Sequence, residues 1–241
     1  MIRLNISGNV IPTPNKLRAS IGNLKLDKTK INLNNVLNTS VVEAELEIQS
    51  TFPKTVQIIF ADDLEYLDII PNIIELDPGE RHTIQYRYNV AQKADFGNFF
   101  DKILVTCKID DMKNTGYLYF TGNIEEDFSY LTEEDKKNAP ALKLDTYVID
   151  LGELHLKEDH QVEIPVRNEG RSDLIIRKIE PSRYCSLESY DSSIKPGEKG
   201  IIQIIVTPQI SRRDFNTSLA LVSNDPSRPS IKIRLTGKIE N

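Results

Sequence analysis

The sequence contains an internal repeat, and this repeat constrains the fold more than any other feature of the chain. Leu24-Lys25-Leu26-Asp27 recurs as Leu142-Lys143-Leu144-Asp145, and Pro78-Gly79-Glu80 recurs as Pro196-Gly197-Glu198. Both recurrences are separated by 118 positions, so no gap is needed between them. We therefore expect two copies of one structural unit.

Each copy ends on the same short motif. Residues 116–124 read GYLYFTGNI, residues 231–239 read IKIRLTGKI, and a third version, IRLNISGNV, occupies residues 2–10. Because nothing precedes this third version, we interpret it as the closing strand of a missing preceding repeat. The alternative is that residues 2–10 are the first strand of the first unit.

Short segments that alternate between apolar and polar residues predominate within each copy. Residues 41–48 and 161–166 alternate in this way, and turn-forming sequences such as Asn224-Asp225-Pro226 follow such segments. No long stretch has the 3.6-residue period of an amphipathic helix. A unit with roughly seven short strands buries its apolar faces most simply as two packed antiparallel sheets. The sequence thus predicts an all-β protein with two tandem immunoglobulin-like β-sandwich domains.

The expected domain boundaries follow from the repeat. Residues 1–13 are the leftover closing strand with a linker, and residues 14–127 form the first immunoglobulin-like domain. An acidic linker spans residues 128–140, and the second domain spans residues 141–241. We interpret the linker as a solvated spacer, with an acidic partner-binding segment as the alternative. Thr132, followed by three acidic residues, predicts a capped helical turn within it.

Charge and missing motifs argue against several functions. The chain has 30 Lys and Arg against 36 Asp and Glu, a net charge of −6, which opposes the phosphate contacts of nucleic-acid binding. No apolar run approaches the roughly 18–20 residues of a membrane-spanning helix. The sequence has no nucleophile elbow, phosphate-binding loop, dinucleotide-binding turn or calcium loop. We therefore predict a protein that is not an enzyme, with no cofactor, metal or nucleic-acid partner.

The histidines and cysteines suggest little chemistry. His155 and His160 fall on a strand–turn segment and lack the convergent third ligand that a zinc site needs. Cys107 aligns with Val222 in an alternating strand and is expected to be a small buried hydrophobe. Cys185 is expected to be free or buried, with a reactive thiol as the alternative. A hydrolase or thiol-dependent activity around His155, His160 or Cys185 is the second alternative function.

The closing strand of the first unit contains the candidate binding residues. Leu118 and Phe120 correspond to apolar residues of the second copy and are expected to face the core, so Tyr117 and Tyr119 should face outward. The second copy carries charged residues at the positions of both tyrosines. Tyrosine offers a large amphipathic contact area at low entropic cost, which suggests a partner-binding surface. The alternative is cross-strand packing on an exposed sheet face, or packing against the neighbouring domain.

Four short motifs of the second unit, in their order and spacing, carry a family resemblance. They are Arg167-Asn168-Glu169-Gly170, Pro196-Gly197-Glu198, Ser223-Asn224-Asp225-Pro226 and Leu235-Thr236-Gly237-Lys238-Ile239. The second unit, and more weakly the first, resembles the DUF1573 family of tandem immunoglobulin-like domains. These domains are related to the major-sperm-protein and ASH type and occur chiefly in Bacteroidetes envelope proteins of unknown function. Members usually carry a Ser-Cys-Gly-Cys-Thr-like stretch, whereas residues 181–186 of this chain retain one cysteine, Cys185.

The resemblance implies export to the periplasm or the cell surface. Together with the predicted fold, it suggests a non-enzymatic cell-envelope binding or scaffold module that acts through protein–protein contacts. The partner would be an unidentified envelope protein, bound at Tyr117 and Tyr119. A glycan-binding or enzyme-accessory module is the first alternative, which the absence of tryptophan stacking platforms weakens.

Overall fold

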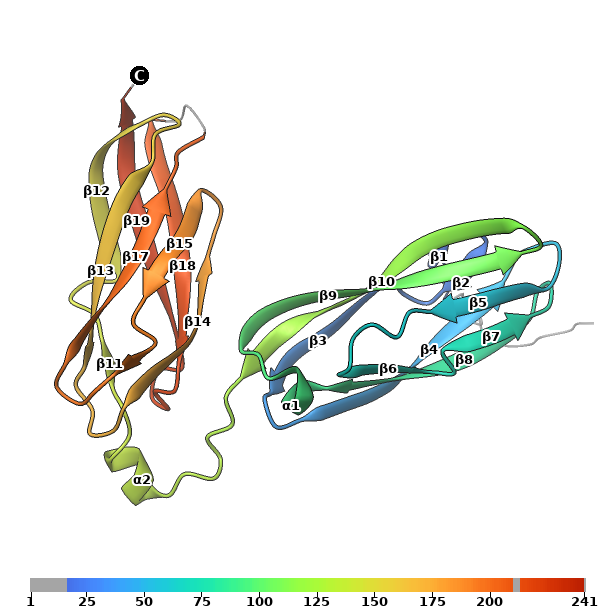
Figure 1. The fold of residues 1–241 in the computed structure, drawn as a ribbon, viewed down its shortest axis with the longest axis horizontal. Helices are drawn as coiled ribbons and strands as arrows, with labels where there is room; N and C mark the ends of the chain where they lie inside the picture. Colours follow the sequence, from blue (N-terminus) through green and yellow to red (C-terminus); the bar gives the residue numbers. More distant parts are fainter. Residues whose placement is uncertain (1–16, 210–212, 241) are drawn as a thin grey trace, which may run out of the picture. The chain divides into compact units, whose positions relative to one another are not determined.

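A computed structural model describes residues 17–209 and 213–240 of the chain, which divides into two compact units. Figure 1 shows that strands make up most of the ribbon, with the short helices α1 (Val90–Lys93) and α2 (Glu133–Lys137) between them. The prediction of an all-β protein with tandem immunoglobulin-like β-sandwiches is confirmed. Residues 2–10, the expected closing strand of a preceding repeat, lie outside the described residues.

The strands between residues 19 and 125 build the N-terminal sandwich. They are β1 (Ala19–Ile21), β2 (Leu24–Leu26), β3 (Lys30–Leu37), β4 (Val41–Ser50), β5 (Val56–Phe60), β6 (Leu67–Ile70), β7 (Ile73–Leu76), β8 (Arg81–Asn89), β9 (Gly97–Ile109) and β10 (Met112–Glu125). One sheet has the order β1-β2-β4-β8-β6 and is called the β8 sheet. The other has the order β3-β10-β9-β5-β7 and is called the β10 sheet.

The strands between residues 142 and 240 build the C-terminal sandwich. They are β11 (Leu142–Lys143), β12 (Val148–His155), β13 (His160–Asn168), β14 (Leu174–Pro181), β15 (Cys185–Tyr190), β16 (Ser193–Ile194), β17 (Lys199–Val206), β18 (Asp214–Ser223) and β19 (Ser230–Glu240). Its sheets have the orders β11-β13-β17-β15 and β12-β19-β18-β14-β16. Each sandwich has more strand segments than the roughly seven expected, because short edge segments such as β11 and β16 form separately.

The repeat of 118 residues holds at the level of individual hydrogen bonds. The N–H of Gly79 donates to the carbonyl of Ser50, and the N–H of Gly197 donates to the carbonyl of Asn168, both at 2.9 Å. The φ angles of the two glycines are 81° and 78°, a left-handed conformation that glycine adopts without a side-chain penalty. The Pro-Gly-Glu motif therefore forms the same turn in both units.

Apolar side chains fill the space between the two sheets of each sandwich. In the N-terminal sandwich, the rings of Tyr86 and Tyr88 lie 5.4 and 5.9 Å from the ring of Phe120, which is fully buried. Cys107 is also buried there, which confirms its expected packing role. The C-terminal core is mainly aliphatic. Because both cysteines are free, apolar burial rather than a disulfide stabilises these cores.

The segment predicted to be an acidic linker contains the expected helical turn, which is α2. The hydroxyl of Thr132 accepts a hydrogen bond from the N–H of Asp135 at 3.2 Å, and the carboxylate of Asp135 accepts one from the N–H of Thr132 at 2.9 Å. This reciprocal capping box satisfies two N–H groups at the start of the helix. Hydrogen bonding by Thr132 lowers the pKa of Asp135, so this carboxylate stays charged at the positive helix end.

Candidate functional site

The tyrosines predicted to bind a partner lie together on the outward side of the β10 sheet. Their ring centroids are 6.1 Å apart. Tyr117 is 39% exposed, whereas Leu118 and Phe120 on the same strand are fully buried. The expected alternation of β10 is therefore confirmed: its apolar side chains enter the core, and Tyr117 and Tyr119 face away from it.

Lysines of the two neighbouring strands flank the tyrosine pair. Lys102 of β9 places its Nζ atom 4.9 Å from the centroid of the Tyr117 ring, in cation–π geometry. On the other side of β10, the N–H of Tyr119 donates to the carbonyl of Thr29 at 2.8 Å. This bond brings Lys30, the exposed first residue of β3, beside Tyr119.

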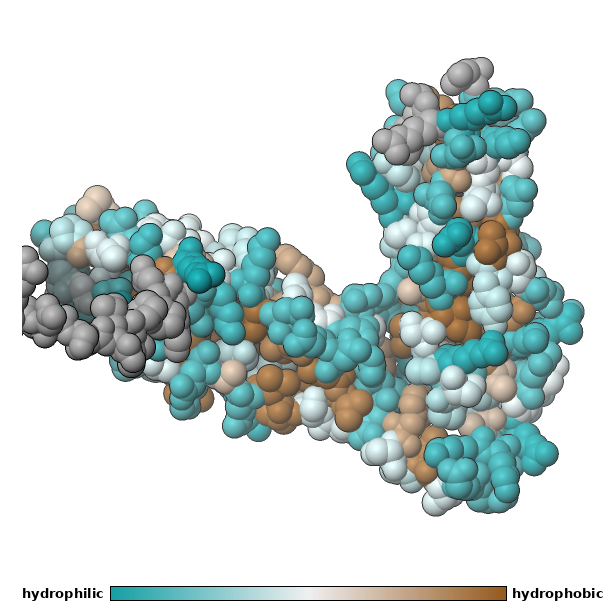
Figure 2. All heavy atoms as spheres, turned by 180° about the vertical axis from the view of Figure 1, so that it is seen from behind, coloured by the Kyte–Doolittle hydropathy of each residue, from teal (hydrophilic) through white to brown (hydrophobic). Residues whose placement is uncertain are grey.

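Apolar side chains continue the tyrosine pair across the sheet. Leu104 of β9 is partly exposed on the same side as Lys102. Beyond β9 in the sheet order, Ile59 of β5 pairs directly with Ile73 of β7. The side chain of Ile73 is 52% exposed. Figure 2 shows one side of the molecule, on which hydrophilic side chains predominate and hydrophobic atoms form separate patches. We call the outward side of the β10 sheet around the two tyrosines the tyrosine face, composed of Tyr117, Tyr119, Lys102, Leu104, Ile59 and Ile73.

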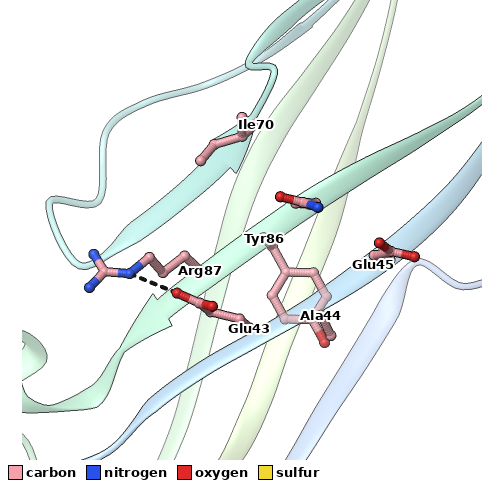
Figure 3. A pocket seen from close by; sticks show the side chains of 7 residues that line it. Glu43, Ala44, Glu45, Ile70, Tyr86 and Arg87 are labelled. Atoms are coloured by element: carbon pink, nitrogen blue, oxygen red, sulfur yellow. Dashed lines mark hydrogen bonds and ion pairs between the residues drawn. The ribbon is translucent and has the colours of Figure 1, made fainter.

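A hollow of about 310 Å³ lies on the β8 sheet, between β4, β6 and β8. Figure 3 shows Arg87 and Glu43 pointing toward one another from neighbouring strands, with Nε and Oε1 3.1 Å apart. Arg87 also lies 3.8 Å from Asp68. Burial, and secondarily the charge of Asp27, raises the pKa of Tyr86, so this phenol stays neutral. The hollow thus brings together an ion-pair network rather than an activated nucleophile and its base.

The two histidines singled out by sequence come close to each other. His155 at the end of β12 and His160 at the start of β13 have ring centroids 6.3 Å apart. Nδ1 of His155 lies 3.9 Å from the carboxylate of Glu240. Among residues 17–209 and 213–240, no group of three or more His, Cys, Asp or Glu side chains is placed to hold a metal ion.

The two thiols are protonated at neutral pH. Burial raises the pKa of both Cys107 and Cys185 to about 11. Because the thiolate rather than the thiol is the nucleophile, this environment disfavours thiol chemistry at either position.

The raised pKa of Cys107 predicts a loss of stability at high pH. The thiol has an ordinary pKa of 9.0, which applies to the unfolded chain, against about 11 in the fold. As pH rises, the thiol of Cys107 therefore loses its proton first in the unfolded state. The contribution of this thiol to the free energy of unfolding is complete below pH 9 and declines as pH rises toward 11. We expect the stability difference between wild type and Cys107→Ala to shrink by roughly 1 kcal/mol per pH unit in this window. Urea unfolding of both proteins from pH 8 to 11 measures it, and a constant difference would contradict it.

Comparisons with known proteins find an immunoglobulin-like family match in the C-terminal part of the chain and solved structures of similar fold. Residues 140–238 match the family described as HYDIN/CFA65/VesB-like, Ig-like domain. A protein of unknown function from Porphyromonas gingivalis W83 has a similar crystal structure, with a TM-score of 0.66, 16% identity, and coverage of 90% of this chain and 100% of that chain. The ASH/PapD-like domain 7 of human CEP192 gives a TM-score of 0.39 with 13% identity, covering 52% of this chain and 99% of that chain.

The periplasmic chaperone SfaE gives a TM-score of 0.37 with 10% identity, covering 90% of this chain and 100% of that chain. A comparison with curated proteins gives no match. The likeness to the P. gingivalis protein shows the fold over most of the chain. Within the described residues, no helix has both the length and the apolar content needed to cross a membrane.

The sequence predicts the two outward tyrosines but not the side chains that surround them. Period-two alternation within β10 places Tyr117 and Tyr119 outward without any knowledge of neighbouring strands. Lys102, Leu104 and Ile59 join them only through the strand order of the β10 sheet, which no short motif of the sequence encodes.

Proposed function

We propose that this protein is a non-enzymatic binding or scaffold module of the cell envelope that acts through protein–protein contacts at the tyrosine face. The outward pair Tyr117 and Tyr119 carries this proposal. The pair lies on β10, which is held between β3 and β9, so the rings are presented from a rigid strand. Aromatic anchors among aliphatic neighbours are the usual source of binding energy in protein interfaces.

Irregular sheet edges in the C-terminal sandwich favour binding through faces. A partner strand adds most readily to a long, flat and unpaired edge. Edge strand β12 has a register shift between Asp150 and Glu153, with Gly152 in a left-handed conformation. Edge strand β15 has a register shift between Leu187 and Ser189. Both edges therefore disfavour the addition of a partner strand.

Edges of the N-terminal sandwich are short as well. Strand β1 has three residues, and β6 and β7 have four residues each. Strand β3 is longer but contains Asn34 with a φ of 58°, at the position equivalent to the left-handed Gly152. Face-on contact is therefore the mode of recognition that we propose for this unit.

We further propose membership in the DUF1573 family, a periplasmic or cell-surface location, and the domain limits 14–127 and 141–241 with residues 128–140 as a spacer. The shared Pro-Gly-Glu turn supports the two-domain division, as do the end of β10 at Glu125 and the start of β11 at Leu142. Fractionation of source cells with an antibody to this chain tests the location. Recovery with cytoplasmic markers alone would contradict it.

The double variant Tyr117→Ser/Tyr119→Ser tests the proposed function. We expect it to lose a partner that wild type captures from source cells, because serine removes the aromatic contact area. Its melting midpoint should stay within about 5 °C of wild type, since the replaced rings lie outside the core. Affinity capture with mass spectrometry, followed by calorimetry with the purified partner, measures the loss.

The matched control is Lys232→Ser/Arg234→Ser, which changes the equivalent positions of the second unit. This control should retain the partner. Equal retention by the tyrosine variant would show that the tyrosine face is not the binding surface. If wild type binds no protein but does bind on a glycan array, the protein-contact proposal is wrong.

A further inference from the structure

The charges around the tyrosine pair differ in sign from the chain as a whole. The chain carries a net charge of −6, yet Lys30 and Lys102 flank the pair on two sides. Neither lysine forms an ion pair with any residue that the structure describes. Lys102 instead contacts the ring of Tyr117. The local surface is therefore cationic and aromatic.

The acidic residues of the same sheet bind other groups or lie away from these two lysines. The carboxylate of Asp101 on β9 accepts a hydrogen bond from the hydroxyl of Tyr88, and that of Glu125 on β10 accepts one from the side chain of Asn35. Glu75 of β7 pairs across the sheet with Gln57 of β5, which pairs in turn with Lys108 of β9. Glu75 therefore lies on the β7 edge of the sheet, two strands away from β9 and three strands away from β10. Lys30 and Lys102 are left as uncompensated positive charges beside the tyrosines.

The β8 sheet of the same sandwich shows the contrasting arrangement. There Arg87 lies within 3.1 Å of Glu43 and 3.8 Å of Asp68. The positive charge of Arg87 is thus paired with carboxylates of the same sandwich. The uncompensated positive charges instead coincide with the exposed aromatic rings on the β10 sheet.

We infer that the tyrosine face binds an acidic protein segment whose aromatic or aliphatic side chain packs on Tyr117, Tyr119 and Leu104. Carboxylates of this segment would meet Lys30 and Lys102 at the rim. This inference rests on the proposed function and names the class of partner. An apolar centre with a charged rim is the common anatomy of protein interfaces, and complementary charge increases the rate of encounter.

The aliphatic part of the face favours a protein segment over an anionic polysaccharide. Ile59 and Ile73 extend the surface with side chains that offer no hydrogen bond to sugar hydroxyls. Burying unpaired hydroxyls against such side chains costs free energy, whereas burying apolar side chains there is favourable. A polysaccharide would use the lysines but not the aliphatic row.

A peptide-display experiment tests this inference with the full chain. A random dodecapeptide library is depleted on Tyr117→Ser/Tyr119→Ser and then selected on wild type. We expect the selected peptides to be enriched in Asp and Glu together with aromatic or aliphatic residues. A synthetic peptide from this set should bind Lys102→Glu at least about tenfold more weakly than it binds wild type. Its affinity for wild type should fall as the salt concentration is raised.

Lys25→Glu makes the same charge reversal on β2 of the β8 sheet and should leave peptide affinity unchanged. Peptides that need the tyrosines but show no acidic bias, or that bind Lys102→Glu as tightly as wild type, would overturn the acidic-partner inference and leave the proposed function standing. If no selected peptide depends on the tyrosines, both the inference and the proposed binding surface are wrong. Tyrosine-dependent binding of heparin in place of peptides would also overturn the inference.

Discussion

Replacing Asp225 by alanine is expected to destabilise the C-terminal sandwich by roughly 3 kcal/mol or more. The side chain of Asp225 is only 1% exposed. Its Oδ2 atom accepts a hydrogen bond from the N–H of Leu142 at 2.8 Å, and its Oδ1 atom accepts bonds from the N–H and hydroxyl of Ser227 at 2.8 and 2.7 Å. Alanine leaves these donors without an acceptor. Urea unfolding of the full chain measures the loss in the transition of this sandwich.

Asp225→Asn is the matched control for this prediction. It keeps one oxygen that can accept from Ser227, but it turns an amide N–H toward the N–H of Leu142. We therefore expect a smaller loss than with alanine, because only one of the two anchored segments loses its acceptor. If Asp225→Ala and wild type unfold at the same midpoint urea concentration, the carboxylate of Asp225 does not stabilise the turn.

The short-range hydrogen bonds of Asp225 are of a kind that a local sequence motif can predict. Ser223-Asn224-Asp225-Pro226 is a recognisable motif because its carboxylate binds N–H groups two and three residues ahead, which is a local turn chemistry. The Pro-Gly-Glu turns and the Thr132 capping box were predictable for the same reason. Each depends on residues that are close in sequence, so the spacing of the motif carries the geometry.

Long-range pairings explain what sequence could not predict. Leu142 contacts Asp225 across 83 positions, and no pattern in either segment encodes the other. Likewise, Lys102 lies over Tyr117 only because β9 and β10 are adjacent in their sheet. Strand register sets such contacts, and a change of register by one residue would move the lysine to the other face. The tyrosines could therefore be predicted as exposed, but not as part of a cationic surface.

Asn168→Ala is also expected to lower the free energy of unfolding of the C-terminal sandwich by roughly 3 kcal/mol. The side chain of Asn168 is buried, with all of its hydrogen-bonding capacity used inside the C-terminal sandwich. Its Oδ1 atom accepts from the N–H groups of Gly170 at 2.9 Å and Ala141 at 3.3 Å. Its Nδ2 atom donates to the carbonyls of Ser172 at 2.8 Å and Ile194 at 2.9 Å. Urea unfolding measures the loss, and an unchanged unfolding midpoint would contradict the prediction.

Asn168→Ser is the matched control, because the equivalent residue of the N-terminal sandwich is Ser50, which is fully buried. The hydroxyl of Ser50 lies 3.4 Å from the N–H of Phe52, the position that corresponds to Gly170. Serine can therefore keep the bond to Gly170 but is too short to replace the amide donor, and we expect an intermediate loss. Asn168 and Asp225 both bind the backbone at residues 141–142, so the double alanine variant should lose less than the sum of the single losses. Strict additivity would show that the two side chains stabilise independent parts of the sandwich.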